Sequence, residues 1–437
     1  MLKLQGWPSS GLAMALTDTV FMQEFRSNWR VLLVAFTCFL FAFSAPAFLM
    51  PFIYPEVIEA FGWTREQATL LASTKYLTGS IIAIAVGRFI DVMGVRKVLI
   101  AVSVIGGLAM VSFLWTPNLT IYYAAGVMLG FAGAGTMVAI KVLISRTFHA
   151  SQGTAMGIAM LGTSVGGVIV PLVITWLIET YGWRVGSALL SAGVWIVALP
   201  LMVFFLTDES FESAEAKDTL APHEPAALSR VVVSELAMQP QFWLIALAVF
   251  AAGFVDQAFI QHQVLYLKDD LGMSASHYAG GIAAMGLLGI VIRPLVGGLF
   301  DKMSTRGVSL SYMMLAFGSL FALGAINPYL FAAFVVFRAI GHSAVLLDTT
   351  VLAKHTFGLK NIGIILGVYT GAVNLGFATG PWFMARMFVV TGSYVTPFII
   401  CCGVAIFAAA VLIPVKPVYW LDLRARSKSG LAAYAVS

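Results

Sequence analysis

The sequence has few charged residues. Lys, Arg, Asp and Glu together make up 10% of its 437 residues, whereas hydrophobic residues make up 60%. The mean hydropathy is +0.93. Soluble globular domains carry about 25% charged residues. The shortage of charge therefore excludes a soluble globular domain and predicts an all-helical integral membrane protein with several apolar spans.

Cysteine and metal-binding patterns are also scarce. The three cysteines, Cys38, Cys401 and Cys402, lie in apolar runs and show neither a disulfide framework nor metal-ligand spacing. The six histidines form no cluster of the kind that a membrane di-metal enzyme needs. GTSVG at 162–166 fits a hydrolase nucleophile motif, but small residues for helix packing explain this glycine-rich apolar run better. We expect no enzymatic activity, no metal and no cofactor.

Long apolar runs, in contrast, are abundant. Spanning a bilayer takes about 20 mainly apolar residues. An acidic, proline-bearing stretch at 207–241 separates the runs into an N-terminal six-helix half at 1–206 and a C-terminal six-helix half at 242–437. We interpret the stretch as a cytoplasmic linker loop. The twelve predicted spans lie at roughly 30–54, 67–90, 97–115, 120–146, 152–178, 184–206, 242–266, 277–300, 307–326, 329–353, 362–388 and 395–415.

Basic residues are unequally divided between the two sides of these spans. Seventeen of the 25 Lys and Arg residues lie at the termini and in the connections of one side, whereas the other side has Arg65, Arg184 and Lys268. Because basic loops remain cytoplasmic, this predicts a multi-pass protein of the plasma (inner) membrane with both termini in the cytoplasm. The asymmetry also explains the net charge of +5 without nucleic acid as a partner.

The two halves repeat at a fixed offset of 210 residues. An even number of spans separates matching segments, so matching segments cross the membrane in the same direction. The sequence therefore predicts two parallel six-helix repeats, with substrate bound between them near the midplane. The matching pairs are Gly62 and Gly272, Thr64 and Ser274, Gly87 and Gly297, Asp91 and Asp301, Arg96 and Arg306, Gly153 and Gly363, Gly157 and Gly367, Gly166 and Gly376, and Pro171 and Pro381.

The segment GRFIDVMGVRKVLI at 87–100 resembles the signature loop of the major facilitator superfamily. Val92 and Val95 depart from it, because the family usually has basic residues there. The resemblance implies the major facilitator fold and alternating access, with a conformational latch on the cytoplasmic side. Arg96 is also explained as a topology signal alone, and both interpretations stay open. The latch residues that the resemblance implies are Gly87, Asp91, Arg96, Gly297, Asp301 and Arg306.

Seven ionisable residues lie within the predicted spans. Lys141 and Arg386 lie near span ends, where a long side chain reaches the interface. Asp348 has either a structural ion pair with Lys354 or His355, or a function. The other four lie deeper, where an ionisable residue indicates a functional site. Three of them are cations and one is an anion, which predicts a cavity completed by an anionic substrate: Lys75, Asp256, Arg293 and Arg338.

The run IRPLVGGLFD at 292–301 is similar to the arginine-bearing eighth helix of the monocarboxylate porter and oxalate–formate antiporter branch. The resemblance implies that Arg293 binds a substrate carboxylate, for which a planar guanidinium is suited. Two positions depart from that branch. Gly289 stands where the porters usually have aspartate, and Asn374 stands where the oxalate branch has lysine. A second cation for the substrate must therefore come from Lys75 or Arg338.

The remaining polar residues predict how transport is coupled. Asp256 is our candidate proton carrier, and the alternative is a permanent salt bridge to Arg293 or Arg338. His342 lies one turn after Arg338 and is a candidate proton relay, with packing as its alternative. His262 is expected to line the substrate path together with Asn374. The coupling ion is either a proton or a counter-anion.

We therefore predict a monomeric secondary transporter for a small organic anion, most simply a monocarboxylate, by proton symport or anion exchange. One alternative is a drug or cation/proton antiporter of the same superfamily. That class favours acidic membrane charge and a fuller glycine–proline pattern than GTSVGGVIVP at 162–171. The other alternative is a membrane receptor that does not transport.

Overall fold

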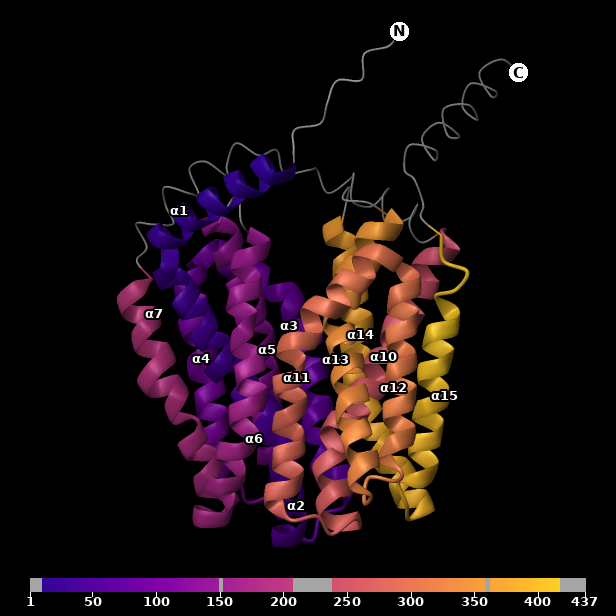
Figure 1. The fold of residues 1–437 in the computed structure, drawn as a ribbon. Helices are drawn as coiled ribbons and strands as arrows, with labels where there is room; N and C mark the ends of the chain where they lie inside the picture. The colour runs from indigo at the N-terminus through magenta and orange to yellow at the C-terminus, as the bar shows by residue number, and fades with distance from the viewer. Residues whose placement is uncertain (1–9, 149–151, 207–237, 358–361, 417–437) are drawn as a thin grey trace, which may run out of the picture.

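The computed structural model of the chain describes residues 10–148, 152–206, 238–357 and 362–416. Within these ranges the chain is helical and contains no strand. The long helices stand side by side, and the first and last described residues lie at the same end of the bundle (Figure 1). Most of the predicted linker at 207–241 lies outside the described residues.

The first half contains α1 (Ser10–Thr37), the π-helix η1 (Cys38–Ser44), α2 (Ala45–Phe61), α3 (Arg65–Met93), α4 (Val95–Ser112), the short 3-10 helix η2 (Phe113–Trp115), α5 (Leu119–Thr147), α6 (Gln152–Leu190), the π-helix η3 (Gly193–Ala198) and α7 (Leu199–Phe205). The second half contains α10 (Pro240–Leu265), the π-helix η4 (Tyr266–Asp270), α11 (Ala275–Met303), α12 (Thr305–Ala322), α13 (Pro328–Phe357), α14 (Ile362–Thr391) and α15 (Val395–Val411).

These elements confirm the predicted fold class. The segment from α1 through η1 to α2 forms the first span. The long helix α6 changes direction at Gly182, whose φ of 77° lies in the region that favours glycine, and thus supplies the fifth span and the start of the sixth. With the other helices this makes twelve crossings. By length and hydropathy alone, seven helical stretches of the described chain are able to span a membrane.

The repeat is visible in the helix boundaries. Helices α3 and α11 begin and end 210 residues apart, and so do α4 and α12. Helices α6 and α14 begin at the same offset. At the contact between the halves, α3 packs against α14, which is the repeat counterpart of α6. In the same way, α6 packs against α11, which is the repeat counterpart of α3. Each contact therefore joins one repeat position with the other, as expected when an axis along the bundle relates the halves.

Close helix contact between the halves depends on glycine. A Cβ atom added at Gly286 of α11 would lie 2.5 Å from the carbonyl carbon of Gly167 in α6. No side chain fits at that distance, so these glycines allow the two backbones to meet.

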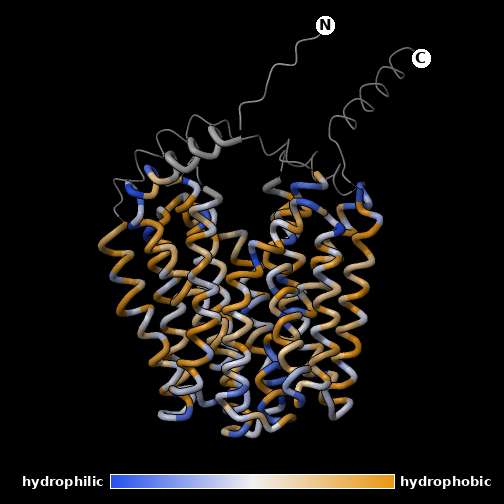
Figure 2. The backbone as a smooth tube through the Cα atoms, in the orientation of Figure 1, coloured by the Kyte–Doolittle hydropathy of each residue, from blue (hydrophilic) through white to orange (hydrophobic). Residues whose placement is uncertain are grey.

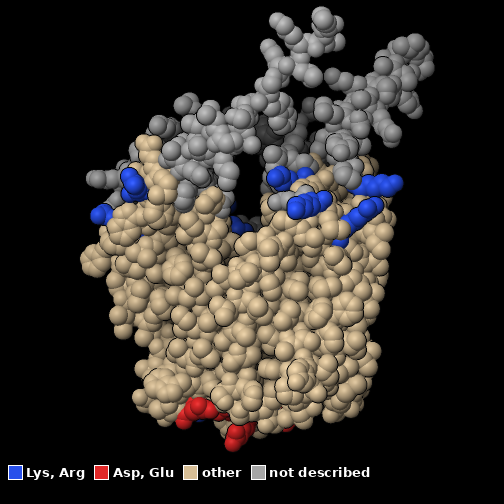
Figure 3. All heavy atoms as spheres, viewed as in Figure 1, with Lys and Arg blue, Asp and Glu red and all other residues tan. Residues whose placement is uncertain are grey.

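The two ends of the bundle differ in charge, and the face seen in Figure 3 is almost free of charged residues between them. Hydrophobic residues are frequent along the helices of this middle part (Figure 2). We call the end where the described chain begins and finishes the basic face, because Lys and Arg gather there (Figure 3). We call the other end the acidic face, because Asp and Glu are visible there. Figure 3 shows a hollow in the basic face between the two halves.

Candidate functional site

A buried ion pair lies in the second half. Asp256 of α10 is 0% exposed, and its Oδ1 accepts a hydrogen bond from Nη2 of Arg338 in α13 at 2.9 Å. Its Oδ2 lies 2.9 Å from Nδ1 of His342, one turn further along α13. A carboxylate only accepts hydrogen bonds, so Nδ1 of His342 carries the proton. Both carboxylate oxygens are therefore satisfied by α13.

Arg338 is almost as deeply buried as its partner. It is 2% exposed, and its Nη2 also donates to the backbone carbonyl of Asp256 at 3.1 Å. Its guanidinium carbon lies 5.1 Å from the ring centre of Phe259. Nε and Nη1 are buried without a hydrogen-bond partner within the described chain. Of the two salt bridges that the sequence left open for Asp256, the structure contains the one with Arg338.

Arg293 connects the two halves. It lies on α11, and its Nη1 donates to Ser164 Oγ at 2.6 Å and to Thr163 Oγ1 at 3.1 Å, both on α6. It forms no ion pair with a carboxylate among the residues that the structure describes. Its Nε is buried without a hydrogen-bond partner there. One edge of the guanidinium is thus fixed to the first half, and the other edge is unpaired.

The unpaired edge of Arg293 faces Gly289, one turn earlier on α11. A Cβ atom at Gly289 would lie 3.8 Å from Nε and 3.9 Å from Nη2 of Arg293. It would also lie 4.0 Å from Oγ of Ser343 in α13. These are ordinary contact distances, so the missing side chain leaves room for an atom group beside the donors. Two parallel N–H groups on one edge are the geometry that binds a carboxylate.

Lys75 is a second buried cation without an acidic partner in the described ranges. It lies on α3, is 6% exposed, and its Nζ is 4.8 Å from the ring centre of Tyr76. The Tyr76 ring in turn packs against Phe377 of α14, 5.3 Å between ring centres. Asn374, on the same helix α14, is partly buried. Together with Arg293, Lys75 leaves two positive charges inside the described bundle without a paired carboxylate.

In this conformation His262 is bonded within the protein, and its place along a substrate path stays a prediction. The residue is 0% exposed. Its Nε2 donates to the carbonyl of Pro381 at 2.9 Å, which leaves Nδ1 of a neutral ring to accept from the Tyr394 hydroxyl at 2.8 Å. Because both ring nitrogens are used, His262 holds α10 against the end of α14 and has no atom left for a ligand.

The predicted latch lies at the basic face, and its role stays a prediction. The side chains of Asp91 and Asp301 lie outside the described residues. Arg96 donates from Nη2 to the Val203 carbonyl at 3.0 Å, within its own half, and Arg306 is exposed. A Cβ atom added at Gly87 or at Gly297 would meet no described atom within 4 Å.

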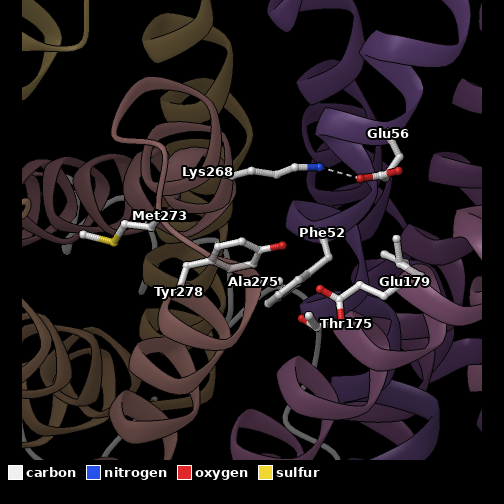
Figure 4. Close-up of a pocket in the computed structure, with 9 residues that line it drawn as sticks. Phe52, Glu56, Thr175, Glu179, Lys268, Met273, Ala275 and Tyr278 are labelled. Carbon is white, nitrogen blue, oxygen red and sulfur yellow. Dashed lines mark hydrogen bonds and ion pairs between the residues drawn. The ribbon is translucent and has the colours of Figure 1, made fainter.

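Ion pairs join the halves at the acidic face. Arg65 lies 2.6 Å from Asp270, and Lys268 lies 2.6 Å from Glu56. Arg386 Nη1 lies 3.6 Å from Glu66. The Lys268–Glu56 pair lies beside a small pocket of about 130 Å³ between α2, α6 and the start of α11 (Figure 4). Further hydrogen bonds cross the same contact, from Tyr54 to Gln261, from Ser73 to the Ala378 carbonyl and from the Trp382 ring N–H to the Glu66 carboxylate.

The acidic face is therefore closed, whereas the basic face is hollow. We expect that removing the ion pairs shifts the equilibrium between this conformation and one in which the acidic face is open. Combining Asp270→Asn with Glu56→Gln should favour opening of the acidic face by about 1 kcal/mol, because partly exposed pairs contribute about 0.5 kcal/mol each. The measurement is labelling of Gln261→Cys, in a background without Cys38, Cys401 and Cys402, by an impermeant thiol reagent. The rate should rise about five-fold.

The exposed Glu59 supplies the matched control, because no described ion pair involves it. Glu59→Gln removes one charge from the same face and should leave the labelling rate unchanged. An equal rise with Glu59→Gln would show that general charge, and not the pairs between halves, controls opening.

Comparison with known proteins identifies the family. The sequence model of the Major Facilitator Superfamily matches residues 31–347. The chain belongs to the major facilitator superfamily. It is 24% identical over 387 residues to the probable sulfoacetate transporter SauU of Cupriavidus necator, covering 84% of this chain and 89% of that one. It is 22% identical over 342 residues to the hexuronate transporter of Escherichia coli, covering 72% and 77%.

Solved structures agree on the fold. A bacterial homologue of the human lysosomal transporter Spinster, in an inward-facing and unoccupied conformation, superimposes with a TM-score of 0.68 at 16% identity, covering 87% of this chain and 94% of that one. A D-xylose–proton symporter gives the same TM-score at 14% identity, covering 89% and 98%. The chain is thus a secondary carrier and not an enzyme.

Sequence reasoning missed Thr163 and Ser164, which bind Arg293. The run that contains them was interpreted as packing alone. The repeat does indicate Ser164 as a site residue, because it lies 210 residues before Asn374, a predicted substrate-binding residue. Polar residues at matching positions of the two central helices α6 and α14 indicate a shared site at one depth.

Proposed function

We propose that the chain transports a small organic anion across the membrane by alternating access, with a carboxylate bound to Arg293 between the halves. One observation supports this above the others: the Arg293 guanidinium is fixed to α6 by Nη1 and has an unpaired edge beside Gly289. A charge that far inside a membrane protein is costly without a partner. A bound carboxylate supplies that partner and forms two charge-assisted hydrogen bonds.

The remaining site residues favour the same class of substrate. Lys75 provides a second cation for another anionic or polar group of the substrate, and Asn374 provides a neutral hydrogen-bonding group. Arg338 is held by Asp256, so it is the weaker candidate for direct binding. Two relatives are named for organic anions, sulfoacetate and hexuronate, which supports this class without identifying the substrate.

Coupling is by proton symport or by exchange against a counter-anion. For a proton, His342 is the better placed member of the pair, because its side chain is 27% exposed whereas Asp256 is 0% exposed. We also propose that the protein is a monomer of the plasma membrane with its basic face in the cytoplasm, so that this conformation is open inward. The gathering of Lys and Arg at the basic face supports that orientation.

Uptake into proteoliposomes tests the proposal. Labelled lactate and sulfoacetate are offered to wild type, Arg293→Gln and the control Lys302→Gln, with and without an inward proton gradient. Lys302 lies exposed at the basic face, so its loss removes a charge without touching the site. We expect wild type and Lys302→Gln to take up the anion and Arg293→Gln to take up none. Uptake of neither anion by wild type would contradict the proposal and favour export of cationic or neutral compounds.

A further inference from the structure

A second buried carboxyl group lies in α13, apart from the pair of Asp256 and Arg338. Asp348 is 0% exposed. Its Oδ2 accepts a hydrogen bond from the hydroxyl of Tyr312 in α12 at 2.5 Å, and Tyr312 is also 0% exposed. Its Oδ1 is buried and has no hydrogen-bond partner in the described structure. Of the two buried aspartates in this half, Asp256 is paired with a cation, whereas Asp348 is bonded to a neutral hydroxyl.

Asp348 has no basic partner among the described residues. Lys354 and His355, which the sequence suggested, form no ion pair with it, and Lys354 is exposed. Besides burial, the groups that act on Asp348 are the Tyr312 hydroxyl of α12, the backbone of Thr349 and the negative charge of Asp256 on α10. Burying an ionised carboxylate without a cation costs several kcal/mol, and neutral hydrogen-bond donors offset only part of this cost. A neutral carboxyl group avoids it.

We propose that Asp348 is a proton-binding site of its own, protonated in this conformation and exchanging its proton with the basic face. The step involves a proton alone: the carboxylic acid gives H⁺ to water and later regains it, with no other bond changed. Asp348 lies six residues beyond His342 on α13, about 9 Å nearer the basic face at the rise of a helix. Its role in coupling rests on the proposed function, whereas its protonation does not.

Infrared spectroscopy of the purified protein in lipid nanodiscs at pH 7 tests protonation directly. Asp348→Asn should remove one band of a protonated carboxyl group. Tyr312→Phe should keep that band and shift its frequency, because the hydroxyl no longer donates to it. The exposed Glu59 is the control, and Glu59→Gln should leave the band unchanged. Loss of carboxylate absorption in Asp348→Asn, with the protonated band intact, would overturn the proposal.

Transport tests the coupling role separately. In proteoliposomes, Asp348→Asn should exchange labelled for unlabelled lactate at close to the wild-type rate. Its accumulation of lactate driven by a proton gradient should be at least ten-fold lower than that of wild type. Unchanged accumulation would overturn the coupling role, whatever the infrared result. If wild type transports no carboxylate, the proposed function fails, while the infrared experiment still decides whether Asp348 holds a proton.

Discussion

Gly289→Asp should strongly lower the affinity for the transported anion, whereas Gly289→Ala should not. A Cβ atom at this position meets Arg293 Nε at 3.8 Å and Nη2 at 3.9 Å, so alanine fits without moving the backbone. Aspartate places a carboxylate against the same two donors. Arg293 then has an internal partner, and a substrate carboxylate must displace it before it can bind. The variant converts the unpaired cation into a closed ion pair.

The expected effect of Gly289→Asp is large. Hydrogen bonds to charged groups contribute about 1.5–3 kcal/mol each, so two of them give about 3 kcal/mol or more. At 1.4 kcal/mol for each factor of ten, affinity should fall at least 100-fold. The measurement is the concentration dependence of uptake in proteoliposomes. Gly289→Asn has the same shape without the charge and should lose much less. Equal losses with Asp and Asn would show that space, and not charge, is responsible.

The sequence was informative where a residue type is costly in its surroundings. The repeat at 210 residues predicted the arrangement of spans, because glycine, proline and charged residues recur at structurally demanding positions. The sequence predicted Arg293 and Lys75 as site residues, because a cation in an apolar membrane span is energetically costly whichever way its helix is rotated. Their positions along the helices followed from counting residues, and the structure leaves both without a described carboxylate.

What the sequence left open depends on which side of a helix meets which neighbour. Asp256 could have met Arg293 or Arg338, and only packing of α10 against α13 decides this. The hydroxyls of Thr163 and Ser164 were not found, because such residues commonly bond their own helix, as Thr163 does to the Met160 carbonyl. The sequence also did not show that the protein itself satisfies both ring nitrogens of His262, because polarity alone does not reveal hydrogen-bond partners.

Removing the charge of Asp256 should destabilise the protein by about 3–5 kcal/mol, the usual cost of leaving one member of a buried pair alone. In Asp256→Asn, the Arg338 guanidinium stays 2% exposed with no carboxylate, and its Nε and Nη1 already lack partners within the described chain. The measurement is denaturant unfolding of purified protein in mixed micelles. Arg338→Gln should cost a similar amount, because it leaves the carboxylate with His342 alone.

The double variant Asp256→Asn, Arg338→Gln separates charge from packing. It keeps the shape of the Asp256 side chain, shortens that of Arg338 and removes both charges, so it should recover much of the lost stability. If the double variant is no more stable than either single variant, hydrogen-bond geometry and not charge balance holds α10 against α13. A stable double variant then allows the functional question to be asked. Gradient-driven lactate accumulation in it would show that the pair is structural, whereas loss of accumulation with exchange intact would place Asp256 in the coupling path.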